Sequence, residues 1–101
     1  MIERHWKGIC KTENAENYKE HLLQDTFKKL VLITGFKGAK ILTRELNGGI
    51  EFLIITIWDS LAAIQKFAGK NVETAVVPEV VRNMMISYDA NAAHYEVNSG
   101  I

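Results

Sequence analysis

Histidine is the residue type best suited to move protons near neutral pH, and this chain contains three: His5, His21 and His94. If His5 and His94 are cross-strand neighbours, they could share a proton as catalytic residues or, together with Glu96, bind a metal ion. A structural position at a strand edge or a subunit interface would explain the same two residues. His21 falls on the charged side of a predicted helix, where we expect it to be solvated.

Five aromatic or sulfur-containing side chains are candidates for a substrate pocket: Trp6, Trp58, Met84, Tyr88 and Tyr95. Trp58 could instead be a core residue that needs only a hydrogen-bond partner for its indole N–H. Met84 and Tyr88 belong to an irregular apolar segment with flexible side chains. Methionines adapt to ligands, but they also fill cores and interfaces. Both interpretations of this group stay open on the sequence alone.

Other reactive residue types give weaker signals. Cys10 has no neighbouring histidine or basic pair to activate it, so we expect a structural role. Lys40 and Arg44 could bind an anionic substrate, although solvated charges are common on an edge strand. No glycine-rich phosphate loop is present, and the sequence predicts no nucleotide or other cofactor.

The composition narrows the class of protein. The 101 residues suit one domain, spanning residues 1–101, and the 48% hydrophobic content is typical of a globular chain. Twelve basic and twelve acidic residues cancel, so neither nucleic acid nor an anionic membrane is an expected partner. One cysteine fits a reducing compartment, and no apolar run suggests a signal peptide or a membrane span. We therefore expect a cytoplasmic location.

These residues must be positioned by regular elements, of which the segment 50–69 is the clearest. Residues 50–58 are β-branched and aromatic, with apolar side chains at both odd and even positions. This pattern predicts a central strand that is covered on both faces. Asp59 or Ser60 can then cap a short amphipathic helix that ends at Gly69.

The remaining elements follow from periodicity and turn residues. We expect a strand over 2–10, whose charged residues suggest that it is less buried than strand 50–58. A helix should follow from Thr12 or Asn14 to about Leu30. A strand over 36–45 leads into a hairpin. A loop at Asn47-Gly48 in a tight primed turn would pair Arg44 with Glu51, whereas a loop at Gly48-Gly49 would shift the register. A short helix after Pro78 that includes 84 and 85, a turn at 89–91 and a strand over 93–97 complete the chain.

The order strand, helix, strand, strand, helix, strand is that of the ferredoxin-like split βαβ fold, an α+β architecture. Its helices cover one face of a four-stranded antiparallel sheet. Exposing the second apolar face of strand 50–58 would cost several kcal/mol, at about 25 cal/mol per Å². The sequence therefore predicts a homodimer in which two sheets pack face to face.

One family resemblance runs from Ile2 to Val97. Its motifs are Phe-Leu-Ile-Ile-Thr-Ile-Trp-Asp-Ser over 52–60, Phe-Ala-Gly over 67–69, Ala-Val-Val-Pro over 75–78 and His-Tyr-Glu-Val over 94–97. They resemble the antibiotic biosynthesis monooxygenase-like family of dimeric α+β barrels. The resemblance implies a homodimer with a pocket in each subunit, between sheet and helices. A haem-degrading branch of the family needs an Asn on the first strand, a Trp on the second helix and a haem-ligating His soon after it. This chain has no Asn on its first strand, and it has Phe67 in place of the Trp and Val77 in place of the His, so haem degradation is not expected.

The resemblance implies a cofactor-independent monooxygenase that oxidises an apolar aromatic, quinol-type small molecule with molecular oxygen. A base such as His5, His94 or a tyrosine would have to reach the acidic proton. The alternative is a non-catalytic homodimer of the same fold, ligand-binding or stress-associated. The lack of a clustered acid–base motif favours that alternative, whereas the likeness in fold favours the enzyme.

Overall fold

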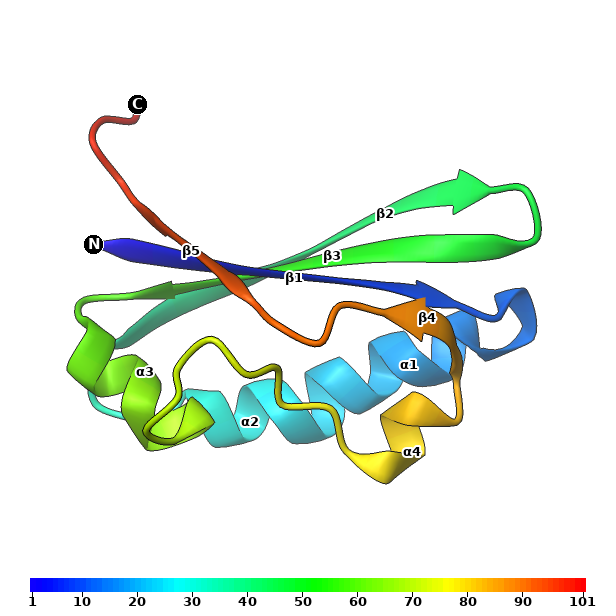
Figure 1. Cartoon of the computed structure of the whole chain (residues 1–101), viewed down its shortest axis with the longest axis horizontal. Helices are drawn as coiled ribbons and strands as arrows, with labels where there is room; N and C mark the ends of the chain where they lie inside the picture. The colour runs from blue at the N-terminus through cyan, green and yellow to red at the C-terminus, as the bar shows by residue number, and fades with distance from the viewer.

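The computed structural model describes residues 1–101 and contains one sheet with helices on one side (Figure 1). The strands are β1 (Ile2–Cys10), β2 (Phe36–Leu46), β3 (Gly49–Trp58), β4 (Met85–Tyr88) and β5 (Ala93–Glu96). The helical elements are η1 (Thr12–Asn14), α1 (Ala15–His21), η2 (Leu22–Thr26), α2 (Phe27–Leu30), α3 (Leu61–Ala68) and α4 (Glu79–Arg82). No helix is long and apolar enough to cross a bilayer.

The sheet confirms the predicted ferredoxin-like α+β fold. Its order is β2-β3-β1-β4, all neighbours are antiparallel, and β5 also pairs with β1. The final strand is thus divided: β4 pairs with the end of β1 and β5 with its beginning. The first strand is consequently a central strand. It is less buried than β3, as expected, although its charged residue Arg4 is 4% exposed.

The β2–β3 hairpin has the register predicted for an Asn47-Gly48 loop. Leu46 pairs with Gly49, Arg44 with Glu51 and Leu42 with Leu53. The turn type differs from the prediction. A primed turn needs a positive φ at its first central residue, and here only Gly48 has one, at 93°. The glycine alone supplies the unusual backbone conformation.

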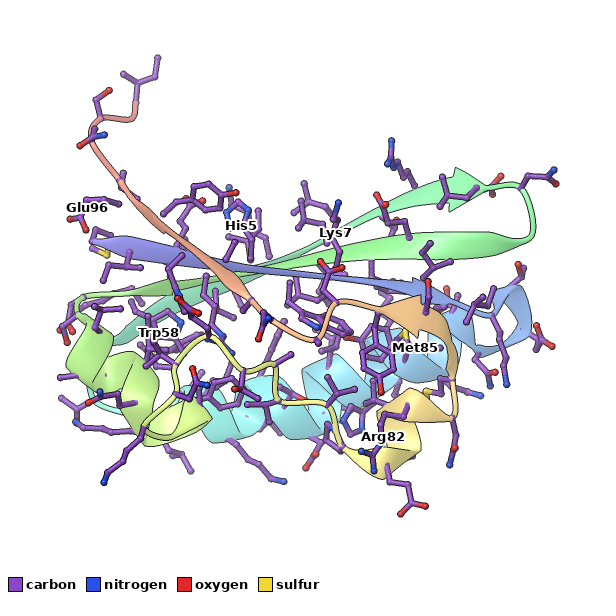
Figure 2. All side chains as sticks on the ribbon, in the orientation of Figure 1. His5, Lys7, Trp58, Arg82, Met85 and Glu96 are labelled. Atoms are coloured by element: carbon purple, nitrogen blue, oxygen red, sulfur yellow. The ribbon has the colours of Figure 1, made fainter.

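The two faces of the sheet have different surroundings. Phe52, Ile54 and Trp58 of β3 pack beneath the helices in two buried clusters. Leu53, Ile55 and Ile57 alternate with them and lie on the face without helices, which we call the open face. Figure 2 shows His5 and Lys7 on this open side, whereas Trp58 and Met85 lie between sheet and helices.

The helical segment from 12 to 30 is not a single regular helix, as the sequence suggested, but changes type along its length. A 3₁₀ turn precedes α1, and η2 is a π-helix that separates α1 from α2. π-turns inside α-helices are rare and are frequent at functional sites. This one follows His21 directly.

Residues 69–78, which we call the strap, run below the sheet from α3 towards α4 (Figure 1). Backbone hydrogen bonds join the strap to the segment between β4 and β5. Ala75 N–H donates to Ala90 O at 3.0 Å, and Ala92 N–H donates to Glu73 O at 2.7 Å. The helix predicted after Pro78 exists as α4, but it ends at Arg82. Met85 belongs to β4, because pairing with Cys10 of β1 outweighs the local helical spacing.

Candidate functional site

A pocket lies between the sheet and the helices, and we call it the inner pocket. Its empty space, including the part open to solvent, is about 580 Å³. Ten of its fifteen lining residues are hydrophobic, contributed by β1, β3, the helices 15–30 and 61–68, the strap and α4. Its side chains with polar groups are few: Arg4, Trp6, Tyr18, His21, Thr26 and Thr56. Apolar walls with a few polar groups are typical of small-molecule sites.

His21 lines the inner pocket, so the expectation that it is solvated is wrong. Its side chain is 16% exposed, and Nε2 is buried without a hydrogen-bond partner. Asp25 Oδ2 lies 3.9 Å from Nε2, beyond hydrogen-bonding distance. A buried ring nitrogen with no protein partner is available to accept a proton or a hydrogen bond from a bound molecule.

Arg4 is the cationic side chain of the pocket and is almost completely buried. Its Nη1 donates to Val72 O and contacts His94 Nε2 at 2.8 Å, while Nη2 donates to Thr74 O at 3.0 Å. The guanidinium carbon lies 5.7 Å from the centre of the Phe67 ring. Burial lowers the pKa of Arg4 from its ordinary value. Arg4 therefore joins β1 to the strap at the wall of the pocket.

Two hydroxyl groups of the wall have defined roles. Burial raises the pKa of Tyr18 well above its ordinary value of 10, so this phenol stays protonated and can donate a hydrogen bond. Thr56 Oγ1 accepts a hydrogen bond from Trp58 Nε1 at 2.8 Å. Trp58 is 0% exposed, stacks on Phe67 and does not line the pocket. Trp58 is therefore a core residue whose indole N–H has a hydrogen-bond partner, which was the alternative to a place in the pocket.

Trp6 is the one predicted pocket residue that lines the inner pocket. Its Nε1 donates to Asp89 O at 2.8 Å, which fixes the ring. The Trp6 ring packs against Gly8, and a Cβ atom on residue 8 would lie 2.7 Å from the ring. The other four predicted pocket residues lie elsewhere. Trp58 belongs to the buried cluster around Leu30, and Met84 packs against the buried cluster around Cys10. The ring centre of Tyr88 lies 6.3 Å from that of Trp6, and Tyr95 is on the open face.

His5 and His94 lie on adjacent strands but on opposite faces of the sheet. His94 pairs with Arg4, whereas His5 pairs with Ala93. His5 Nε2 bonds Glu3 Oε1 at 2.9 Å on the open face, and its ring lies 4.8 Å from that of Tyr95. The two histidines therefore cannot share a proton directly. No three His, Cys, Asp or Glu side chains form a group that could hold a metal ion, and this includes His5, His94 and Glu96.

His94 contacts the pocket through Arg4. Burial, assisted by the Arg4 charge, lowers the pKa of His94 from its ordinary value of 6.5, and Glu73 opposes the shift. The neutral ring can then accept the hydrogen bond from the guanidinium at Nε2. His94 thus positions Arg4 without lining the inner pocket itself.

Sequence signals for Arg4 and His21 were present. Arg4 shares its strand face with Trp6 and Cys10, two and six residues later, as the alternation of a strand requires. His21 follows Tyr18 by three residues and so adjoins the apolar stripe of its helix. Both residue types are usually solvated, and this preference concealed the pattern.

No protein-family model matches the sequence, and no curated protein matches it. Solved structures match the fold. One of them, from Bacillus cereus, is provisionally described as an antibiotic biosynthesis monooxygenase, and it aligns with a TM-score of 0.67 over 100% of this chain and 94% of that chain. Sequence identity between the two is 16%. At that identity the likeness concerns architecture, and the chain has the ferredoxin-like fold of this antibiotic biosynthesis monooxygenase-like structure.

Proposed function

We propose that the protein binds an apolar aromatic, quinol-type molecule in the inner pocket and oxidises it with molecular oxygen without a cofactor. The observation that carries the proposal is the buried, unpartnered Nε2 of His21 in a pocket with apolar walls. A base in this setting can act on a substrate that excludes water from the pocket. The likeness in fold to a structure described as a monooxygenase supports the same direction.

The atoms and electrons of this oxidation balance with the substrate and O₂ alone, without a cofactor. His21 Nε2 removes a proton from an activated ring CH₂ in the keto tautomer of the substrate, whose carbonyl stabilises the carbanion through the aromatic rings. Asp25 stabilises the resulting imidazolium. The carbanion gives one electron to O₂, and the two radicals combine to form a C–O bond. His21 returns its proton to the peroxide. Loss of water, with the second C–H proton, leaves a carbonyl, so CH₂ and O₂ become C=O and H₂O.

Oxygen consumption with an anthrone tests this function. We expect His21→Gln to reduce the rate by about 10²- to 10⁴-fold, the usual contribution of a general base, while the circular dichroism spectrum stays unchanged. The sequence-based assignment of His5 and His94 as catalytic stays a prediction that the same assay tests. Loss of rate in His5→Gln or His94→Gln, with none in His21→Gln, would contradict the role of His21.

A non-catalytic ligand-binding protein is the second candidate. Two polar groups of the pocket wall, Trp6 N–H and Thr56 Oγ1, already have partners within the chain, which suits a rigid binding site. Anthrone binding by calorimetry without oxygen consumption would select this function. Binding with His21-dependent consumption would exclude it.

We also propose that the open faces of two subunits pack together as a homodimer. Leu42, Leu53, Ile55 and Ile57 provide adjoining apolar side chains on this face, and Leu42 is exposed. Ile57→Lys should convert the dimer to a monomer in light scattering. Leu61→Lys, the same kind of change on exposed α3, should not. A wild-type monomer at micromolar concentration would contradict the proposal.

A further inference from the structure

We propose that Arg4 forms an anion subsite in the inner pocket, so that the ligand is an apolar molecule carrying a single carboxylate-type oxyanion. This inference deepens the proposed function, since it names the chemical class of molecule that the same pocket takes. It depends on the pocket as a binding site and does not depend on oxygen chemistry.

The first observation is a buried positive charge without a negative partner. Arg4 is 4% exposed, and none of the five ion pairs of the chain includes it. Its protein partners are the carbonyl oxygens of Val72 and Thr74 and the ring of His94. Glu73 influences His94 but forms no ion pair with Arg4. Burying an unpaired charge is costly, so a ligand that brings the counter-charge is favoured.

The second observation is the set of free donors on the guanidinium. Arginine has five N–H groups. Nη1 uses both of its N–H groups, on Val72 O and His94 Nε2, and Nη2 uses one, on Thr74 O. Nε–H and one Nη2–H therefore have no partner in the chain. Two N–H donors on one planar group suit the two oxygens of a carboxylate.

The third observation is that these contacts hold the guanidinium in place. The strap carbonyls fix two of its nitrogens, and the Phe67 ring lies beside it. A donor group that is already ordered loses little conformational entropy when a ligand binds. Arg44, in contrast, lies exposed on β2 and is paired with Glu51 at 2.6 Å.

The rest of the pocket limits the ligand to one charge and an apolar body. Arg4 is the one arginine or lysine among the lining residues. Phe27, Leu30 and Ile54 supply apolar walls. A second anionic group would have no cationic partner and would have to be desolvated.

Calorimetry with a matched pair of probes, 2-naphthoate and 2-naphthamide, tests the subsite at pH 7.5. We expect the wild-type protein to bind the carboxylate about 10- to 100-fold more tightly than the neutral amide, as charge-assisted hydrogen bonds allow. Arg4→Gln should remove this preference, and Arg44→Gln should keep it. Arg4→Lys, which keeps the charge but loses the planar pair of donors, should retain only part of it.

The outcomes separate this inference from the proposed function. Equal binding of both probes by the wild type would overturn the anion subsite, even if anthrone oxidation depends on His21. This comparison requires no variant, so an unfolded Arg4→Gln protein would not obscure it. A carboxylate preference that depends on Arg4, without any oxygen consumption, would support the subsite and remove the oxygenase function. Absence of binding by either probe would overturn the subsite as well.

Discussion

The hydrogen bond from Trp58 Nε1 to Thr56 Oγ1 gives a prediction of stability that follows directly from burial. Thr56 lines the inner pocket, but Trp58 is 0% exposed, so water cannot reach the indole N–H if the hydroxyl is removed. Thr56→Val keeps the shape of the side chain but leaves the indole N–H without an acceptor. The cost should therefore come from the unsatisfied donor and not from a cavity.

An unsatisfied buried donor costs about 1–3 kcal/mol. In a domain of this length, each kcal/mol lowers Tm by about 4–8 °C, so Thr56→Val should lower Tm by about 10 °C. Urea denaturation should show the same loss as a lower midpoint at constant slope. Replacing both partners, in Thr56→Val with Trp58→Phe, removes the unpaired N–H. The double variant should lose at least about 1 kcal/mol less than the sum of the two single losses.

Thr43→Val is the matched control, because Thr43 is an exposed residue of the neighbouring strand, opposite Phe52. It should change stability by no more than about 0.5 kcal/mol. A Thr56→Val protein as stable as the wild type would refute the reasoning, since it would mean that the indole N–H is satisfied in another way. Additive single losses in the double variant would have the same meaning.

Three further predictions concern other parts of the chain. Ser60→Ala should cost about 1 kcal/mol in urea denaturation, because Ser60 Oγ accepts from Ala63 N–H at 3.1 Å and caps α3, while Ser60→Asp should lose much less. The pKa of His94 is lowered on folding, so the unfolded chain binds more protons just below pH 6.5. The free energy of unfolding should therefore fall as pH drops through 6.5, with a smaller slope in His94→Gln; an unchanged slope would contradict this. Cys10 is 0% exposed and burial raises its pKa, so iodoacetamide should modify it only in denaturant, and rapid native labelling would disprove its burial.

Local patterns were sufficient for most of the fold. The strand 50–58 and the helix that follows it were correct, and the hairpin has one of the two registers left open, because alternation, capping residues and turn residues act over a few neighbours. The division of the last strand could not be read in this way. Met85 follows a helical spacing, yet it pairs with Cys10, seventy-five residues earlier, and such a contact has no local signature.

The candidate site was harder to predict than the fold. Trp6 was identified as a pocket residue because large aromatic side chains attract attention in a sequence. Arg4 and His21 were not, because a charged residue on a strand and a histidine on a helix are usually solvated. The burial of Arg4 depends on the strap, whose carbonyl groups accept hydrogen bonds from this residue about seventy positions earlier in the chain.

The two edges of the sheet differ in how they could pair with another chain. One edge is interrupted, since β4 and β5 are separate four-residue strands joined by a bent segment. The other edge is the eleven-residue strand β2, which carries Lys37, Lys40 and Arg44. Short strands and positive charges both disfavour the addition of a foreign strand. The sheet is thereby protected against growth into fibrous aggregates, even though one of its faces is rich in isoleucine and leucine.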